Sequence, residues 1–153
     1  MYRRYAANGG EKAGASSTSA QTVVSMISTA AIRPYLYDWT FGATGTPVDS
    51  VQTITVTRAT SMTAGTSCVA VTGSPLDSTD AASTTTFGGT WTTEPTIGVT
   101  LFSVGLNVRA TYRWVAAPGG ELICPATANA GLALRSTALA YTGDAQGQIY
   151  IAE

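Results

Sequence analysis

The 153-residue sequence contains no histidine, a single lysine and two cysteines, and only 11% of its residues are charged. Without histidine it lacks the side chain that most often transfers protons near neutral pH and the commonest metal ligand. Two cysteines do not make a disulfide framework. We predict that Cys68 and Cys124 are buried as small apolar side chains. The composition favours a structural or binding module over an enzyme.

Concentrated positive charge and long apolar runs are also missing. Eight basic residues stand against nine acidic ones, whereas contacts with nucleic-acid phosphates need clustered lysine and arginine. No apolar run approaches the roughly 18 residues that a membrane-spanning helix needs. The polar segment 8–12 stands where the apolar part of a signal peptide would lie. We therefore expect no nucleic-acid partner and no membrane partner.

Threonine, in contrast, fills 26 positions. Its β-branched side chain favours strands and disfavours helices. Short strand-like runs recur along the chain, separated by turn residues, and no stretch shows amphipathic helical spacing. The sequence predicts an all-β protein, a sandwich or barrel of about eight to ten short strands. A small domain with so few charges usually has partners that cover its neutral surface.

Domain organisation follows from the first residues. Residues 1–20 are rich in glycine, alanine, serine and threonine and have no apolar period. We predict a flexible or extended N-terminal arm over residues 1–20, which includes Lys12, and a single β-sandwich domain over residues 21–153. The long turn-rich segment 73–96 is expected to be a contact loop, with Phe87 and Trp91 packing part of it down as a short strand.

The chemistry-bearing residues do not form a catalytic pattern. The acids Asp38, Glu94, Glu121 and Asp144 lie in separate segments, and no nucleophile elbow or phosphate-binding loop occurs. The segment 77–80 (DSTD) has too few ligands for a calcium loop and is expected to form an Asx turn. We predict no catalytic residue, no cofactor site and no metal site, and hence no enzyme.

The sequence offers clearer candidates for binding residues than for catalytic ones. Tyr2, Arg3, Arg4 and Tyr5 combine the residue types that are enriched in interface anchors, and we predict that they contact a partner. Arg113 is a further candidate contact, because its strand neighbours suggest that it faces away from the core. We expect these five residues to carry the partner surface.

The segment 35–41 has an aromatic side chain at every odd position, namely Tyr35, Tyr37, Trp39 and Phe41. Strict alternation predicts a strand with all four on one face. They could form a platform for stacking sugars, but packing in the core is the favoured interpretation.

Three C-terminal segments carry a resemblance to a known family: residues 109–122 (RATYRWVAAPGGEL), 129–135 (NAGLALR) and 147–153 (GQIYIAE). Together they resemble the small jelly-roll head decoration, or cement, proteins of tailed bacteriophages. The likeness covers residues 31–153 and is strongest after residue 98.

This resemblance implies a jelly-roll-like fold and a homotrimer that is made in the host cytoplasm. The trimer would bind the major capsid protein on the exterior of the virion and bridge neighbouring capsomers. The family offers no catalytic residues. A glycan-binding β-sandwich module of a phage tail or fibre is the alternative.

Overall fold

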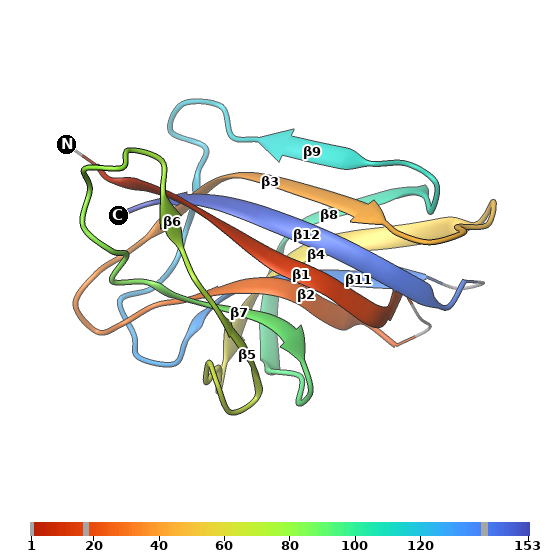
Figure 1. The fold of residues 1–153 in the computed structure, drawn as a ribbon, viewed down its shortest axis with the longest axis horizontal. Coiled ribbons are helices and arrows are strands. Elements are labelled where there is room, and N and C mark those ends of the chain that lie inside the picture. Colours follow the sequence, from red (N-terminus) through yellow and green to blue (C-terminus); the bar gives the residue numbers. More distant parts are fainter. Residues whose placement is uncertain (1, 17–18, 139–140) are drawn as a thin grey trace.

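The structure is a computed structural model and describes residues 2–16, 19–138 and 141–153. Strands make up its regular structure, and these ranges contain no helix (Figure 1). In chain order the strands are β1 (Arg4–Ser16), β2 (Gln21–Ile27), β3 (Tyr35–Ala43), β4 (Val51–Thr60), β5 (Cys68–Val71), β6 (Ser74–Pro75), β7 (Thr86–Trp91), β8 (Thr96–Asn107), β9 (Tyr112–Val115), β10 (Leu122–Ile123), β11 (Gly131–Ala138) and β12 (Gly143–Ala152).

Two antiparallel sheets pack face to face. Sheet A has the order β10-β3-β12-β1-β6, with β9 also paired to β3, and sheet B has the order β5-β7-β2-β11-β4-β8. The first strand lies beside the last, and β1, β2, β3 and β4 alternate between the sheets, as in a jelly roll. The predicted all-β, jelly-roll-like sandwich is confirmed. The two-residue strands β6 and β10 bring the strand number above the expected range.

The main core fills the space between the sheets. Its largest fully buried side chains include Trp39, Phe41, Phe87 and Met26. A second cluster includes Met62, Cys68 and Trp91 packed with Ile27, Ala59 and Ala133. Cys68 and Cys124 are both free and buried, as predicted.

The segment 73–96 is only partly a loop. It contains β6, which pairs with β1, and β7, which joins sheet B beside β2. Phe87 and Trp91 are buried in β7, which confirms that they pack this part of the segment down.

Strand β3 departs from the predicted alternation. Trp39 and Phe41 are buried with Leu36, which confirms the core interpretation for these two aromatics. Tyr35 and Tyr37 instead line a surface cavity. The cause is a β-bulge, because β3 advances two residues where its partner β12 advances one, so that Tyr37 is inserted. The four aromatics therefore do not share a face.

The predicted N-terminal arm is replaced by a strand of sheet A. The backbone of β1 is extended, but it lies between β12 and β6 and does not project from the body. Tyr5 and Ala7 are buried in the main core. The predicted boundary at residue 20 therefore does not separate an arm from a body. Residues 1, 17 and 18 lie outside the described residues.

The small residues that suggested flexibility have a packing role in β1. A Cβ atom on Gly9 would lie 2.5 Å from the Val23 carbonyl oxygen. A Cβ atom on Gly89 of β7 would lie 2.3 Å from the Gly9 carbonyl oxygen. Only glycine allows these backbones to approach so closely. The glycine content of β1 thus lets sheet A pack closely against sheet B.

Candidate functional site

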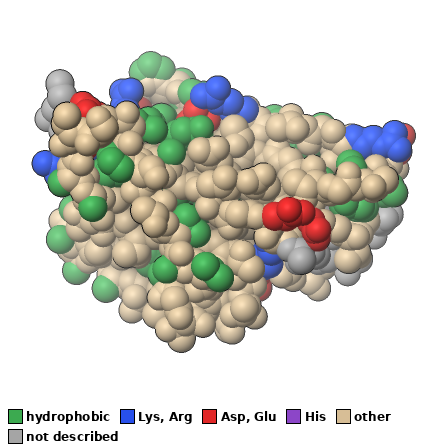
Figure 2. All heavy atoms as spheres, viewed as in Figure 1, with side chains coloured by type: hydrophobic (Ala, Val, Ile, Leu, Met, Phe, Trp, Pro, Cys, Tyr) green, Lys and Arg blue, Asp and Glu red, His purple; other side chains and the backbone are tan. Residues whose placement is uncertain are grey.

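The outer face of sheet A carries most of the predicted contact residues. Figure 2 shows the molecule from the side on which sheet A lies in front. Charged side chains occupy separate spots there, and uncharged side chains and backbone cover most of the remaining surface. The exposed side chains of β1, β12, β3 and β9 form this face. Its two ends differ in chemistry.

The two chain ends lie together at one end of the sandwich (Figure 1). Two adjoining cavities are lined by residues near these ends. The first, of about 480 Å³, lies between Tyr2, Arg4 and the two partly buried tyrosines of β3, and Glu121 also lines it. The second, of about 500 Å³, lies between residues 2–4 and the loop after β6. Tyr2 and Arg4 line both. We call the pair the terminal cavities.

Aromatic and ionic contacts fix the terminal cavities. The rings of Tyr2 and Tyr35 meet edge to face with centroids 5.4 Å apart, and the Arg4 guanidinium lies 5.6 Å from the Tyr37 ring centroid. Arg3 forms a 3.7 Å ion pair with Asp80. Tyr2 is nevertheless 65% exposed. A cationic and aromatic surface is thus held in place and open to solvent.

Tyr5 does not belong to this surface, which corrects its assignment as a contact residue. Its side chain is fully buried, and its hydroxyl donates a 3.0 Å hydrogen bond to the Ala81 carbonyl. Strand alternation places Tyr5 on the inner face, opposite to its neighbour Arg4. Burial raises the pKa of the Tyr5 hydroxyl.

Arg113 lies on the same outer face as Arg4. Its Nε donates to both carboxylate oxygens of Asp38 at 3.1 and 3.2 Å, and its Nη2 forms an ion pair with the same carboxylate. These hydrogen bonds and the charge of Asp38 raise the pKa of Arg113. The Arg113 side chain is 62% exposed, whereas that of Asp38 is 5% exposed. Arg113 therefore covers a buried carboxylate and keeps its own face open to a partner.

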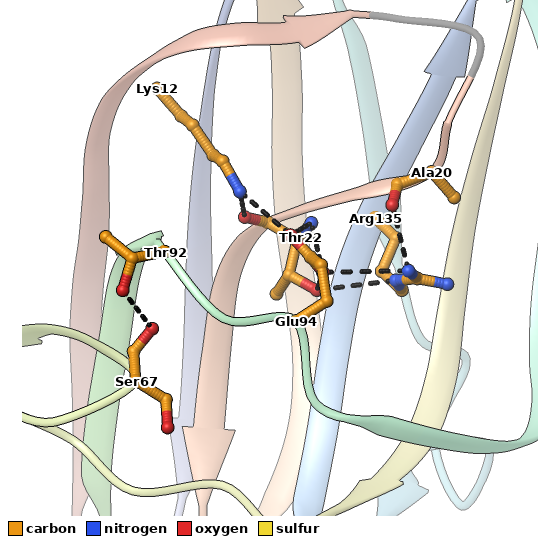
Figure 3. Close-up of polar contacts among 7 residues, drawn as sticks. All are labelled: Lys12, Ala20, Thr22, Ser67, Thr92, Glu94 and Arg135. Atoms are coloured by element: carbon orange, nitrogen blue, oxygen red, sulfur yellow. Dashed lines mark hydrogen bonds and ion pairs between the residues drawn. The ribbon is translucent and has the colours of Figure 1, made fainter.

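A second charged cluster was not anticipated from the sequence (Figure 3). Lys12 Nζ lies 2.9 Å from Glu94 Oε1 and donates a 3.1 Å hydrogen bond to the Thr22 carbonyl. The backbone N–H and the hydroxyl of Thr22 both donate to the Glu94 carboxylate. Arg135 lies 3.6 Å from the same carboxylate. We call Lys12, Thr22, Glu94 and Arg135 the Glu94 cluster.

The Glu94 carboxylate is held in its charged form. Burial alone would raise its pKa, but hydrogen bonds from Thr22 and Lys12, together with the charge of Lys12, outweigh this effect and lower the pKa of Glu94. Figure 3 shows that the cluster joins β1, β2, β11 and the segment after β7. Its partners are 82 residues apart in the case of Lys12 and Glu94, so local sequence patterns cannot reveal it.

The remaining acids do not converge. Asp38 and Glu94 each pair with basic residues, and Glu121 lines the first terminal cavity. Asp77 accepts hydrogen bonds from the backbone and hydroxyl of Thr79, which lower its pKa and form the predicted Asx turn. Within the described residues, no group of three or more histidine, cysteine or acidic side chains could hold a metal ion. No helix in those residues is long and apolar enough to cross a membrane.

Comparisons with known proteins return no match among family models, curated proteins or solved structures.

Proposed function

We propose that this protein is a structural virion protein that decorates the outside of a tailed-phage capsid and bridges neighbouring capsomers. The jelly-roll-like sandwich and the resemblance over residues 31–153 support this role. The observation that carries the attachment surface is the pair of terminal cavities, where Tyr2, Arg3 and Arg4 meet in solvent. The partner is the major capsid protein.

The terminal cavities suit a protein partner. Tyrosine and arginine are the residue types most enriched at the energetic centres of interfaces. The segment 2–4 is ordered before binding, since Arg3 exchanges two 3.0 Å backbone hydrogen bonds with Glu153. Less conformational freedom is therefore lost on contact. Repetition of such contacts over a shell would convert modest affinities into tight attachment.

A homotrimer needs a second surface, and strand β8 supplies a candidate. It is an edge strand of twelve residues without a charged side chain, and within the described residues it pairs only with β4. Val99 within it is 66% exposed. Long neutral edge strands tend to pair with other chains, because no charge opposes the approach. The occupant we assign to this edge is a neighbouring copy of the same chain.

Light scattering coupled to size exclusion tests the β8 contact. Wild-type protein is expected at three times its 15.7 kDa chain mass. Gly105→Lys should give monomers, because a charge on the edge strand opposes pairing, while a Cβ atom there meets nothing within 4 Å in the subunit. Ser78→Lys, in an exposed loop, adds the same charge and should remain trimeric. A Gly105→Lys trimer would show that β8 is not the contact.

Co-sedimentation with shells tests the function. The shells are assembled from the major capsid protein encoded in the same genome, and saturable binding of wild-type protein is expected. Tyr2→Ala and Arg4→Ala should each weaken binding by about tenfold or more, as for anchors at an interface centre. Arg109→Ala removes the same charge from an exposed position outside the terminal cavities and should bind normally. Absence of wild-type binding would overturn the proposed function.

A further inference from the structure

The other end of the outer face of sheet A contains a hollow with a different lining. Its volume is about 300 Å³. The polar side chains that line it are all neutral amides or hydroxyls, namely Asn8, Thr40, Thr44, Thr111, Gln146 and Gln148. They come from β1, β3 and the residue after it, β12 and the turn before β9. We call this hollow the amide pocket.

The amide pocket exists because one position on the sheet has no side chain. Gly42 lies in β3, which pairs with both β12 and β9, and its cross-strand partner in β12 is Gln146. A Cβ atom on Gly42 would lie 3.3 Å from the Thr111 hydroxyl oxygen, on the pocket side. Every larger residue at position 42 would therefore begin to fill the hollow between the Gln146 amide and the Thr111 hydroxyl.

A bulge in β1 holds one wall of the amide pocket. The pairing between β1 and β12 shifts register between Asn8 and Glu11. Asn8 Oδ1 accepts hydrogen bonds from the Gly10 backbone N–H at 2.9 Å and from Gln146 Nε2 at 3.1 Å. Both amides are thereby oriented, and the Asn8 amino group and the Gln146 carbonyl oxygen have no partner within the part of the chain that the structure describes. β-Bulges commonly redirect side chains in this way at binding sites.

Three of the lining residues form a row across the sheet. Cross-strand pairing places Gln148 between Asn8 and Thr40, and Thr40 next to Arg113. The Gln148 amide and the hydroxyls of Thr40 and Thr111 have no hydrogen-bond partner among the described residues. The pocket therefore presents donors and acceptors together, without a charge in its lining.

We propose that the amide pocket binds a neutral carbohydrate. Sugar hydroxyls both donate and accept hydrogen bonds, as the amide and threonine groups of the pocket do. The uncharged lining gives a phosphate or carboxylate no countercharge. The tyrosine next along β12, Tyr150, lies outside the hollow on the same face, 6.4 Å from the Tyr37 ring centroid to centroid, where a second sugar ring can contact an aromatic surface.

This inference does not depend on attachment to a capsid. The amide pocket shares no lining residue with the terminal cavities. A protein attached through the terminal cavities would leave the amide pocket free to contact carbohydrate.

Nuclear magnetic resonance titration of the full-length protein tests the proposal. The probes are a panel of neutral mono- and disaccharides and, as a separate arm, an uncharged blocked tripeptide. Saturable amide shifts confined to residues 8–11, 40–44, 111 and 146–148 are expected with at least one sugar and not with the tripeptide. Gln148→Ala should raise the dissociation constant about tenfold, which corresponds to the loss of one or two hydrogen bonds.

Gly42→Thr is the sharper variant, because it fills the pocket without removing a polar group. It should abolish the sugar-induced shifts. Ala70→Thr introduces the same side chain at an exposed position of β5 in sheet B, outside the amide pocket and the terminal cavities, and should bind sugar as wild type does. Folding of both variants is checked by their spectra. A panel without localised shifts, shifts with the tripeptide alone, or full binding by folded Gly42→Thr would each overturn the proposal.

Discussion

Two charged groups of this protein each pair basic with acidic side chains, but they differ in which partner is buried. In the Glu94 cluster the Lys12 side chain is 6% exposed, and the carboxylate receives hydrogen bonds from both Lys12 and Thr22. In the pair on the outer face of sheet A, Asp38 is buried but Arg113 is 62% exposed. The first group joins four segments of the fold, whereas the second covers one carboxylate from the solvent side.

The difference shows that burial separates charges that stabilise the fold from charges that a partner can contact. A buried cation without its partner is strongly unfavourable, so the Glu94 cluster requires β1 to stay in place. An exposed cation is screened by solvent and can exchange partners at little cost. We therefore assign the Glu94 cluster to stability and Arg113 to the binding face.

Deletion of residues 1–20 should abolish folding. It removes Lys12 from the Glu94 cluster and also removes Tyr5 and Ala7 from the core. The sheet would lose the strand between β12 and β6. Circular dichroism and amide spectra should show an unfolded or aggregated protein. A folded deletion variant would show that β1 is dispensable, as an arm would be.

Glu94→Ala should lower the free energy of unfolding by about 3 kcal/mol, because it leaves the Lys12 ammonium buried without a carboxylate. Urea denaturation measures this loss. The double variant Lys12→Met/Glu94→Ala should regain part of it, since an apolar chain replaces the unpaired cation. Equal loss in the single and double variants would mean that the buried charge is not the cause.

Lowering the pH should reduce the free energy of unfolding of the wild-type protein more than that of the Glu94→Gln variant. The pKa of Glu94 is lowered in the folded state, so its contribution is present above the unfolded value of about 4.3 and disappears as the pH falls through the folded value. Other carboxylates, including Asp77, contribute to both proteins equally. Urea denaturation from pH 6 downwards, at about one-unit steps, compares the slopes. Parallel curves of stability against pH for the two proteins would contradict the stabilising role assigned to the Glu94 carboxylate.

Arg113→Ala should have the smallest effect on stability, because the arginine side chain is largely exposed and water can replace it over Asp38. Its shell binding should nevertheless weaken, because Arg113 lies on the same outer face of sheet A as Arg4. Urea denaturation and co-sedimentation of the same preparation distinguish the two. A loss of stability as large as that of Glu94→Ala would remove the contrast between the two groups.

Local patterns were sufficient for the fold class and for many strands. The β-branched run at 51–58 lies within β4, and the runs at 131–136 and 147–151 lie within β11 and β12. Strand β1 escaped prediction because its glycines and alanines resemble a linker, while its partner β12 lies at the other end of the chain. Its glycines serve close packing, which only the paired structure reveals.

The candidate sites depended even more on distant contacts. Tyr2, Arg3, Arg4 and Arg113 were identified by residue type, and the structure places all four at the surface. Tyr5 was misassigned because the strand that turns it inward was not predicted. The Glu94 cluster and the amide pocket arise from strand pairing and bulges, and neither has a sequence signature.

Cryo-electron microscopy of shells incubated with the purified protein tests whether it bridges capsomers through the terminal cavities. The shells are those assembled from the major capsid protein of the same genome. Trimeric density bridging capsomers on the outer surface, with the terminal cavities against the shell and the amide pocket away from it, is the predicted result. Bare shells at saturating protein, or attachment through the amide pocket end, would show that the terminal cavities are not the capsid-binding surface.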